Sequence, residues 1–291
     1  MVSEGQHARQ RIEDIAMGDC KFCGKPAGFL RNEHKECKRR HERGKAEFIQ
    51  QIAAAPDRGD LAPLPDRLRE IAATGQIERT MLPALMIAGF EEAVERFLDD
   101  HLLTAQEEEK LSELMKVLPV SQEELNRNGA VTRLTQCATL RDIQEGIVPQ
   151  RIQFDGMLPF NLQKSESLVW VFQNVAYLEQ RTRTEFVGGS QGMSFRVAKG
   201  VYYRKGGFKG RRVERTETAH ADTGWLGVTT KHVYFAGAAK RFRIRFDKIV
   251  TFEPYDDGIG LMRDAQTAKP QTFVTGDGWF TYNLIANLAQ M

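Results

Sequence analysis

The feature that most constrains the fold of this chain is a group of three cysteines and one histidine near its N-terminus. Two residues separate Cys20 from Cys23, and His34 and Cys37 follow with the same two-residue separation after a gap of ten residues. Two such pairs supply thiolate and imidazole ligands to opposite sides of a tetrahedral zinc ion. Four protein ligands leave no open coordination position, so we expect Zn(2+) to have a structural role.

Two alternatives remain open for this group. His41 stands four residues after Cys37 and could replace His34 as the fourth ligand. The cysteines could also be free buried thiols without a metal. The fourth cysteine, Cys137, lies apart on an amphipathic segment and is expected in a helical core. Because three of the four cysteines cluster at metal-binding spacing, we expect reduced thiols and a cytoplasmic protein.

The segment that follows Cys37 has the pattern of a helix that is basic in its first half and apolar in its second. Together with the cysteines it resembles a short treble-clef or C2HC zinc finger. Cationic side chains on such a helix contact phosphates with little dependence on base sequence. The predicted nucleic-acid contacts here are Lys35, Lys38, Arg39, Arg40 and Arg43.

Charge is distributed unevenly, although the net charge of the 291 residues is only +2. Residues 20–45 hold nine Lys or Arg and three acidic residues. Residues 191–248 hold fourteen Lys or Arg and four acidic residues. Residues 91–146 between them hold six Lys or Arg and thirteen acidic residues. Basic ends favour a polyanion such as RNA, whereas the acidic middle favours a protein partner or self-association as a homo-oligomer. The competing interpretation is that these charges are only solvated faces.

Three domains are predicted: a finger with its basic helix over residues 1–55, an acidic helical bundle over 56–150, and a β domain over 151–291. Three prolines and a glycine in residues 55–65 suggest a linker or domain edge. Thr104 with Glu107, and Ser121 with Glu124, have the spacing of capping boxes, which predicts helices beginning at both places. No apolar run is long enough for a membrane helix.

After Pro149 the pattern changes to short β-branched or aromatic runs separated by glycine-rich turns, which predicts strands. One of them alternates Arg241, Arg243 and Arg245 with apolar residues, so a basic sheet face is expected to contact nucleic acid. The last residues, from Gly278, read as a helix that covers the sheet. The expected class is therefore α+β, with an antiparallel β-barrel or sandwich closed by a C-terminal helix.

The stretches Asp222-Thr-Gly-Trp-Leu-Gly-Val-Thr-Thr and Phe246-Asp-Lys-Ile-Val-Thr-Phe resemble bacterial PH-like and GRAM-like modules over residues 160–291. The resemblance implies a fold but no chemistry, because such folds serve lipid, peptide and scaffold functions alike.

A catalytic site is suggested only by a cluster of suitable residue types. No nucleotide-binding glycine loop, nucleophile elbow or paired-carboxylate motif occurs. Metal-independent RNA cleavage needs a base, an acid and cations for the phosphorane. The candidates are His220, His232, Arg211, Arg212 and Glu214, with the two histidines as a pair if they face the same side of adjacent strands. The alternative is that His220 only shapes a turn with Asp222.

The order of finger, helical middle and basic C-terminal domain resembles the ring-activated zinc-finger ribonucleases of bacterial phage defence. That resemblance implies RNA cleavage switched on when the protein oligomerises on a phage structural protein. The competing hypothesis is a non-catalytic adaptor, whose PH-like domain binds a protein partner or anionic lipid.

Overall fold

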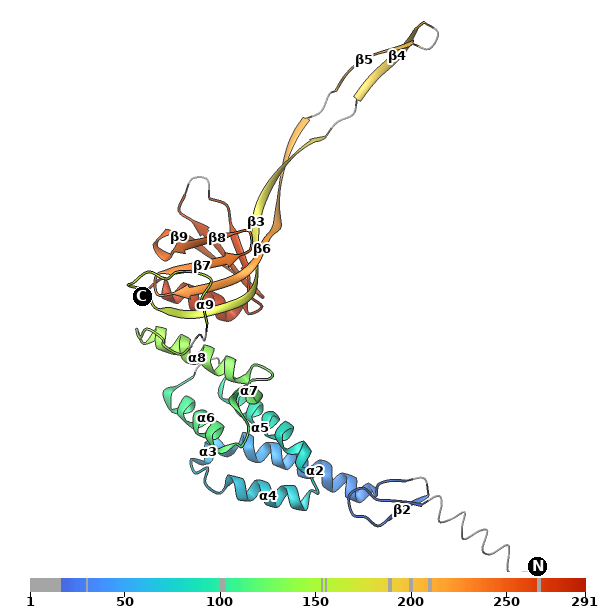
Figure 1. Cartoon of the computed structure of the whole chain (residues 1–291), viewed down its shortest axis with the longest axis vertical. Helices are drawn as coiled ribbons and strands as arrows, with labels where there is room; N and C mark the ends of the chain where they lie inside the picture. The colour runs from blue at the N-terminus through green and yellow to red at the C-terminus, as the bar shows by residue number, and fades with distance from the viewer. Residues whose placement is uncertain are drawn as a thin grey trace, which may run out of the picture. The chain divides into compact units, whose positions relative to one another are not determined.

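A computed structural model describes residues 17–29, 31–99, 103–152, 154, 156–187, 190–198, 201–208, 211–265 and 268–291. The side chains of residues 17, 29 and 181–216 are outside this description. The chain forms two compact units, residues 1–141 and residues 142–291, and each is described here by itself (Figure 1). Both helices and antiparallel strands are present, as the predicted α+β class requires.

The first unit begins with a two-stranded hairpin and continues with helices. Its elements are β1 (Met17–Asp19), β2 (Pro26–Phe29), α2 (Lys35–Ala53), α3 (Ala55–Arg58), α4 (Leu64–Thr74), η1 (Arg79–Met81), α5 (Leu82–Phe97), α6 (Ala105–Val117), α7 (Gln122–Leu125) and α8 (Ala130–Gln144), the last of which extends past the unit boundary. Both predicted capping boxes are confirmed: Thr104 caps α6 and Ser121 caps α7, each with its glutamate bonded back to the cap.

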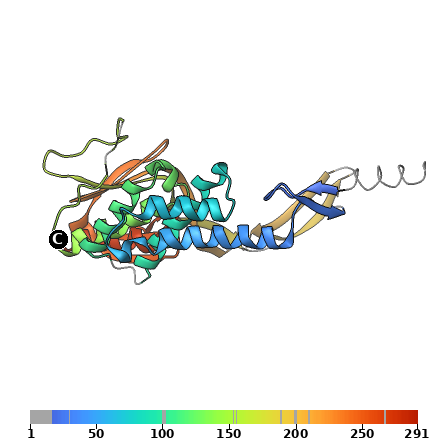
Figure 2. The same ribbon diagram turned by 90° about the horizontal axis from the view of Figure 1, so that it is seen from below.

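Residues on both sides of the predicted boundary at residue 55 belong to the first compact unit. The finger and the helical bundle form one unit because α2 runs unbroken from the β1–β2 hairpin into the helical core (Figure 2). Its second half buries Phe48 and Ile52 there. Ala55 and Pro56, in the expected linker, are buried too, because the chain folds directly into α3.

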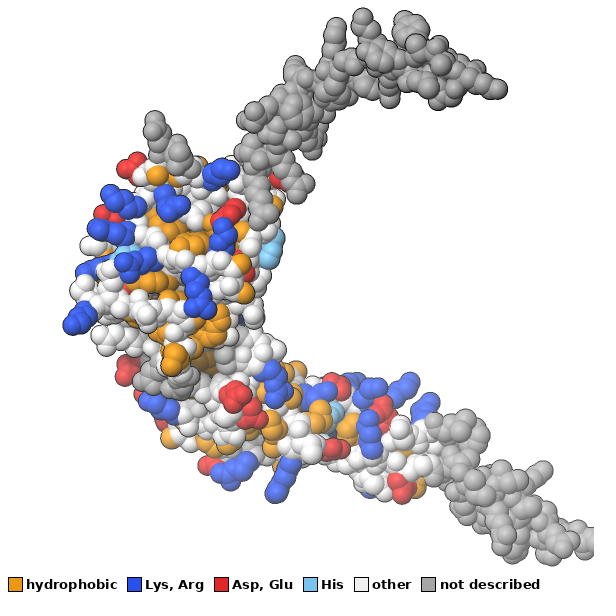
Figure 3. Space-filling model, turned by 45° about the horizontal axis from the view of Figure 1, so that its top comes forward, with side chains coloured by type: hydrophobic (Ala, Val, Ile, Leu, Met, Phe, Trp, Pro, Cys, Tyr) orange, Lys and Arg blue, Asp and Glu red, His pale blue; other side chains and the backbone are white. Residues whose placement is uncertain are grey.

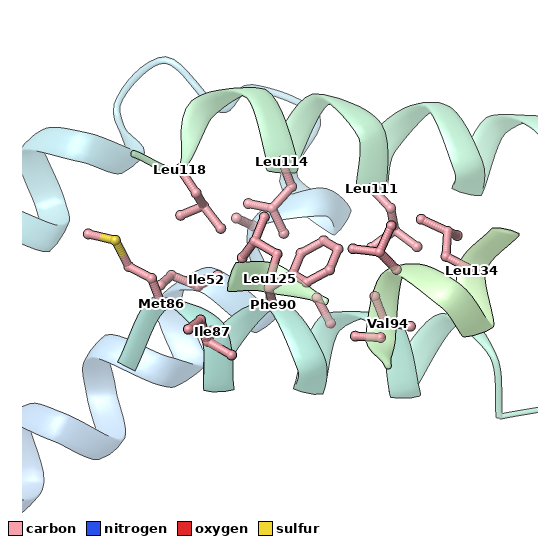
Figure 4. Close-up of a cluster of buried hydrophobic side chains, with 14 of the residues drawn as sticks. Ile52, Met86, Ile87, Phe90, Val94, Leu111, Leu114, Leu118, Leu125 and Leu134 are labelled. Carbon is pink, nitrogen blue, oxygen red and sulfur yellow. The ribbon is translucent and has the colours of Figure 1, made fainter. Parts of the chain in front are cut away.

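The core of this unit is apolar and closely packed. Phe90 of α5 is fully buried among Leu111 and Leu114 of α6, Leu125 of α7 and Ile52 of α2 (Figure 4). Burying side chains of this size contributes about 1.5–3 kcal/mol each to folding, so this core holds α2 firmly at its C-terminal half.

Helices α2 and α4 meet at a contact between two glycines. A Cβ atom on Gly44 would lie 2.8 Å from the Cα atom of Gly75, closer than real Cβ contacts come. His41 Nδ1 bonds to the backbone oxygen of Gly75 at 3.0 Å, beside the same contact. The contact brings the basic half of α2 against the end of α4.

We predict that Gly44→Ala destabilises the protein by about 1–3 kcal/mol, because the added methyl group meets backbone that has no rotamer to change. Helix propensity acts in the opposite direction and favours alanine by about 1 kcal/mol. Urea denaturation of the parent and of Gly44→Ala measures which of the two effects is larger, the steric clash or the gain in helix propensity. A variant more stable than the parent would show that the helices separate readily at this point.

The second unit contains a seven-stranded antiparallel sheet. Its elements are β3 (Leu168–Val187), β4 (Ser190–Ala198), β5 (Val201–Phe208), β6 (Arg211–Thr229), β7 (His232–Gly237), β8 (Arg241–Arg245), η2 (Phe246–Lys248), β9 (Ile249–Tyr255), β10 (Gly258–Arg263), β11 (Gln271–Val274) and α9 (Gly278–Leu288). The strand order is β8-β7-β6-β3-β11-β10-β9. In the part of the chain that the structure describes, β8 and β9 do not pair with each other, so the expected closed barrel is replaced by an open sheet.

Two strands are much longer than the sequence pattern predicts. The apolar runs expected as separate strands are joined in β3 and β6, with register shifts that include one between Phe172 and Val175. Among the described residues, β11 pairs with β3 only as far as Glu179, and β7 pairs with β6 only from Gly224 onward. Beyond these points, the described parts of β3 and β6 pair only with each other. They leave the sheet as a two-stranded ribbon toward the β4–β5 hairpin (Figure 1).

Aromatic side chains fill the core of the second unit. The Tyr177 ring lies 5.1 Å from Phe235 and 5.2 Å from Phe273, which joins strands β3, β7 and β11. The predicted C-terminal helix is confirmed as α9, which packs on β9 and β10 and places Phe280 4.7 Å from Trp170. Within the described residues, no helix has the length and apolarity to cross a lipid bilayer.

Candidate metal centre

The first half of the metal group is a tight turn between β1 and β2. The Gly24 amide donates to the Cys20 carbonyl at 2.8 Å, and the Cys20 amide donates to the Lys25 carbonyl at 2.8 Å. Gly24 has φ +67°, a left-handed conformation that glycine adopts without strain. The turn places the sulfurs of Cys20 and Cys23 on the same side of the hairpin, where they can bind one ion.

The second half is the beginning of α2. His34 is the N-cap residue and Cys37 lies in the first turn of the helix, so both side chains face the hairpin. The His34 amide donates to Cys20 Sγ at 3.4 Å, which ties the start of the helix to the first cysteine. One ion at this place therefore fixes α2 to β1 and β2.

The four donor atoms lie close enough together to bind one ion, and two of their separations are those of a tetrahedral site. All lie within 4.8 Å of one another, and His34 Nδ1 is 3.4 Å from Cys23 Sγ and 3.8 Å from Cys37 Sγ. Bond lengths of about 2.3 Å to sulfur and 2.0 Å to nitrogen place ligands of tetrahedral zinc about 3.5–3.8 Å apart. The donor set and its spacing therefore fit a metal ion of this kind.

The imidazole of His34 is oriented for metal binding. Its Nε2 lies 3.0 Å from the carbonyl oxygen of Pro26. A carbonyl only accepts, so Nε2 carries the proton and the lone pair of Nδ1 points toward the sulfurs. Metal-bound histidines are held by outer hydrogen bonds of this type.

Electrostatics at the three thiols favour a bound cation. Burial opposes ionisation of Cys20, but hydrogen bonds from the amides of His34, Cys23 and Phe22 outweigh it and lower the pKa of Cys20 to about 6. Burial and the sulfurs of Cys23 and Cys20 raise the pKa of Cys37 to about 11. Several thiolates so close together repel one another, and a divalent cation between them removes that repulsion.

His41, the alternative ligand, lies outside the group. It is buried, bonds to Gly75, and its ring centroid is 4.7 Å from that of Phe22. Phe22 lies between the two cysteines of the turn, so His41 connects the metal turn with the end of α4. In the structure, the fourth member of the metal group is therefore His34 and not His41.

The predicted nucleic-acid contacts on α2 divide into paired and unpaired cations. Lys38 pairs with Glu33 at 2.9 Å, and Arg39 pairs with Glu36. Hydrogen bonds from Lys21 and Lys38 lower the pKa of Glu33 to about 2, so that carboxylate stays charged. The unpaired cations, with no ion pair or side-chain hydrogen bond to any described residue, are Lys35, Arg40 and Arg43.

The second predicted basic surface lies on β8. Arg241, Arg243 and Arg245 are exposed and alternate with the less exposed Phe242 and Ile244, as the pattern predicts. Arg245 is bonded to Asp247 through two contacts of 2.9 and 2.8 Å, so part of its charge is compensated. Figure 3 shows one face of the molecule, with Lys and Arg in blue and apolar side chains in orange.

The structure does not place the two predicted catalytic histidines beside each other. Val228 of β6 pairs with Val233 of β7, so His232 lies near Thr229 at one end of the ladder. His220 lies on β6, nine residues before Thr229. At the rise of about 3.3 Å per residue of a strand, this separates it from Thr229 by about 30 Å along the chain. His220 is exposed and its Nε2 is 2.9 Å from Thr223 Oγ1. The side chains of Arg211, Arg212 and Glu214 lie outside the described residues.

His232 belongs instead to a buried polar cluster that the sequence did not reveal. Its Nδ1 lies 2.8 Å from Glu166 Oε2, and the two side chains are 4% and 0% exposed. Glu166 also accepts hydrogen bonds from Thr229 Oγ1 at 2.9 Å, from the Gln163 amide at 2.6 Å and from the Tyr234 hydroxyl. The cluster holds the segment before β3 onto β7. No regular pattern surrounds Glu166, so only the fold shows this contact.

Comparisons with known proteins give no relative for this chain: it matches no protein-family model, and no curated protein is significantly similar to it.

Proposed function

We propose that the chain is a zinc-stabilised, nucleic-acid-binding effector that binds RNA. Cys20, Cys23, His34 and Cys37 hold Zn(2+), which has no open position and serves to fix the hairpin to α2. The observation that carries the proposal is that the helix so fixed begins with cations that no described acidic residue neutralises, Lys35, Arg40 and Arg43.

RNA binding of this kind depends strongly on salt and little on sequence. Each phosphate that a cation contacts contributes about −0.7 to the slope of log affinity against log salt for a single strand. Fluorescence anisotropy with labelled RNA oligonucleotides of two unrelated sequences tests this. We expect similar affinities for both and a slope between about −2 and −3.5, from about three to five such contacts. Absence of binding at low salt would contradict the proposal.

The resemblance to ring-activated zinc-finger ribonucleases supports a further step, in which the cytoplasmic protein oligomerises on a phage structural protein and cleaves RNA. Because His220 and His232 are far apart, they cannot act as one acid–base pair within a chain. Expression with and without phage infection, followed by measurement of bulk RNA integrity, tests the step. Intact RNA in infected cells would contradict it, and the variants His220→Ala and His232→Ala show whether either side chain is required.

The second candidate function is a non-catalytic adaptor. Seven antiparallel strands with a C-terminal helix packed on them support the PH-like interpretation of the second unit. Val250, Tyr255 and Trp279 on β9 and α9 are 59%, 40% and 43% exposed. The adaptor would use such side chains if they form one continuous apolar surface for a protein or a membrane. Flotation with anionic liposomes distinguishes the two functions, since the adaptor requires lipid or protein binding without RNA binding.

A further inference from the structure

An open groove of about 680 Å³ runs between α2, α3 and α4 in the first unit. Its charged lining consists of four arginines and two glutamates: Arg40, Arg43, Arg58, Arg67, Glu47 and Glu70. Arg40 and Arg43 come from α2, Arg58 from α3 and Arg67 from α4, so three helices contribute cations to one concave surface.

The floor of the groove is held in place by the glycine contact between α2 and α4. Gly44 and Gly75 both line the groove, and both are buried. Because the two backbones touch there and His41 bonds to Gly75, the arginines on either side have fixed relative positions. The metal group determines where α2 begins, and the helical core determines where it ends.

The arginines of the groove are available to a ligand. Among described residues, Arg40, Arg43 and Arg67 have no ion pair or side-chain hydrogen bond, and Arg58 donates only to the neutral Gln51, at 2.6 Å. Glu47 and Glu70 form no ion pair with them. Two cations on the same helices but outside the groove are paired: Lys45 with Glu42 at 2.8 Å, and Arg69 with Asp66. Lys35, at the start of α2 and also outside the groove, is unpaired among the described residues.

We propose that this groove binds the phosphodiester backbone of a single nucleic-acid strand. The inference rests on the proposed RNA-binding function and assigns its site: the strand lies between α2 and α4, and Arg58 and Arg67 join Arg40 and Arg43 as contacts. The planar guanidinium group donates two parallel hydrogen bonds to a phosphate. A concave surface admits one extended strand, whereas the phosphates of a duplex lie on a convex one. None of the described residues that line the groove is aromatic, so the contacts it offers are to phosphates, which carry no sequence information directly.

The test compares two double variants of the full chain that remove the same charge from the same two helices. Arg43→Ala with Arg67→Ala empties the groove of two cations, and the control, Lys45→Ala with Arg69→Ala, removes two paired ones. Anisotropy with a labelled 12-nucleotide RNA is measured at several salt concentrations, with zinc content and thermal unfolding as checks of folding.

We expect the groove variant to bind about tenfold more weakly, with a salt slope smaller by about 1.4, while the control stays within about twofold of the parent. Equal losses in both variants would show that total charge matters and overturn the groove as the site. Unchanged RNA affinity of the groove variant would also overturn the groove as the site, but the proposal that the protein binds RNA would still stand. Failure of the parent protein to bind RNA would overturn both proposals. If the parent protein binds polyglutamate as tightly as RNA, and the groove variant loses both, the groove is a site for acidic peptides and the proposal of a nucleic-acid site is overturned.

Discussion

Replacing Cys23 by serine is expected to weaken metal binding strongly and to destabilise the hairpin together with the first turns of α2. Structural zinc contributes about 10–16 kcal/mol of apparent binding free energy in finger peptides, or about 3 kcal/mol for each of four ligands. Loss of one thiolate therefore lowers metal affinity by about a hundredfold or more. The short strands β1 and β2 have little apolar core of their own, so they depend on the ion.

The unfolding should be confined to one end of the unit. Phe48 and Ile52 keep the second half of α2 in the helical core whether or not the ion is bound. Hydrogen exchange should show lost protection over residues 17–40 and retained protection over α5 and α6. Cys137→Ala is the matched control, because this buried cysteine lies on α8 outside the metal group. An unchanged metal affinity of Cys23→Ser, measured by competition with a chelator, would contradict the assignment of the ligands.

Removing Glu166 is expected to destabilise the second unit by about 3–5 kcal/mol, because Glu166→Ala leaves several buried donors without an acceptor. Asp247→Ala is the control: its pair with Arg245 is exposed, so its loss costs less than about 1 kcal/mol. Urea denaturation measures both. A cost for Glu166→Ala no larger than that of the control would show that the cluster is solvated.

The stabilisation by Glu166 should also depend on pH. Burial opposes its ionisation, but hydrogen bonds from the Gln163 amide, Tyr234, His232 and Thr229 outweigh it and hold the pKa of Glu166 below its ordinary value of 4.5. A group with a lowered pKa contributes stability above its unfolded value, and this contribution is lost as the pH falls through the folded value. The difference between the parent and Glu166→Gln should therefore shrink below about pH 4.5. A difference that stays constant from pH 7 to pH 3 would contradict this account.

The parts of the structure that sequence reasoning predicted correctly depend on residues close together in the chain. The separations within Cys20–Cys23 and His34–Cys37 are set by one turn and one helix start, and both capping boxes lie within four residues. The alternation of Arg241, Arg243 and Arg245 follows from the period of a strand. Such features need no knowledge of the tertiary fold.

The parts that were missed depend on contacts between distant residues. Glu166 meets His232, which lies 66 positions further along the chain, and no periodic pattern links them. The separation of His220 and His232 depends on the register of β6 against β7, and the open sheet depends on which strands remain at its edges. The arginine groove requires the contact of Gly44 with Gly75, which joins helices that the predicted domain boundary had separated.

The central claim is that a metal ion fixes α2 so that its cations bind nucleic acid. The most direct test is to titrate the full chain with a zinc chelator and to measure metal content and RNA affinity in the same samples. The account predicts about one zinc ion per chain at the start and a loss of RNA affinity that parallels the loss of metal, restored when zinc is returned. RNA affinity that persists unchanged in metal-free protein would contradict it.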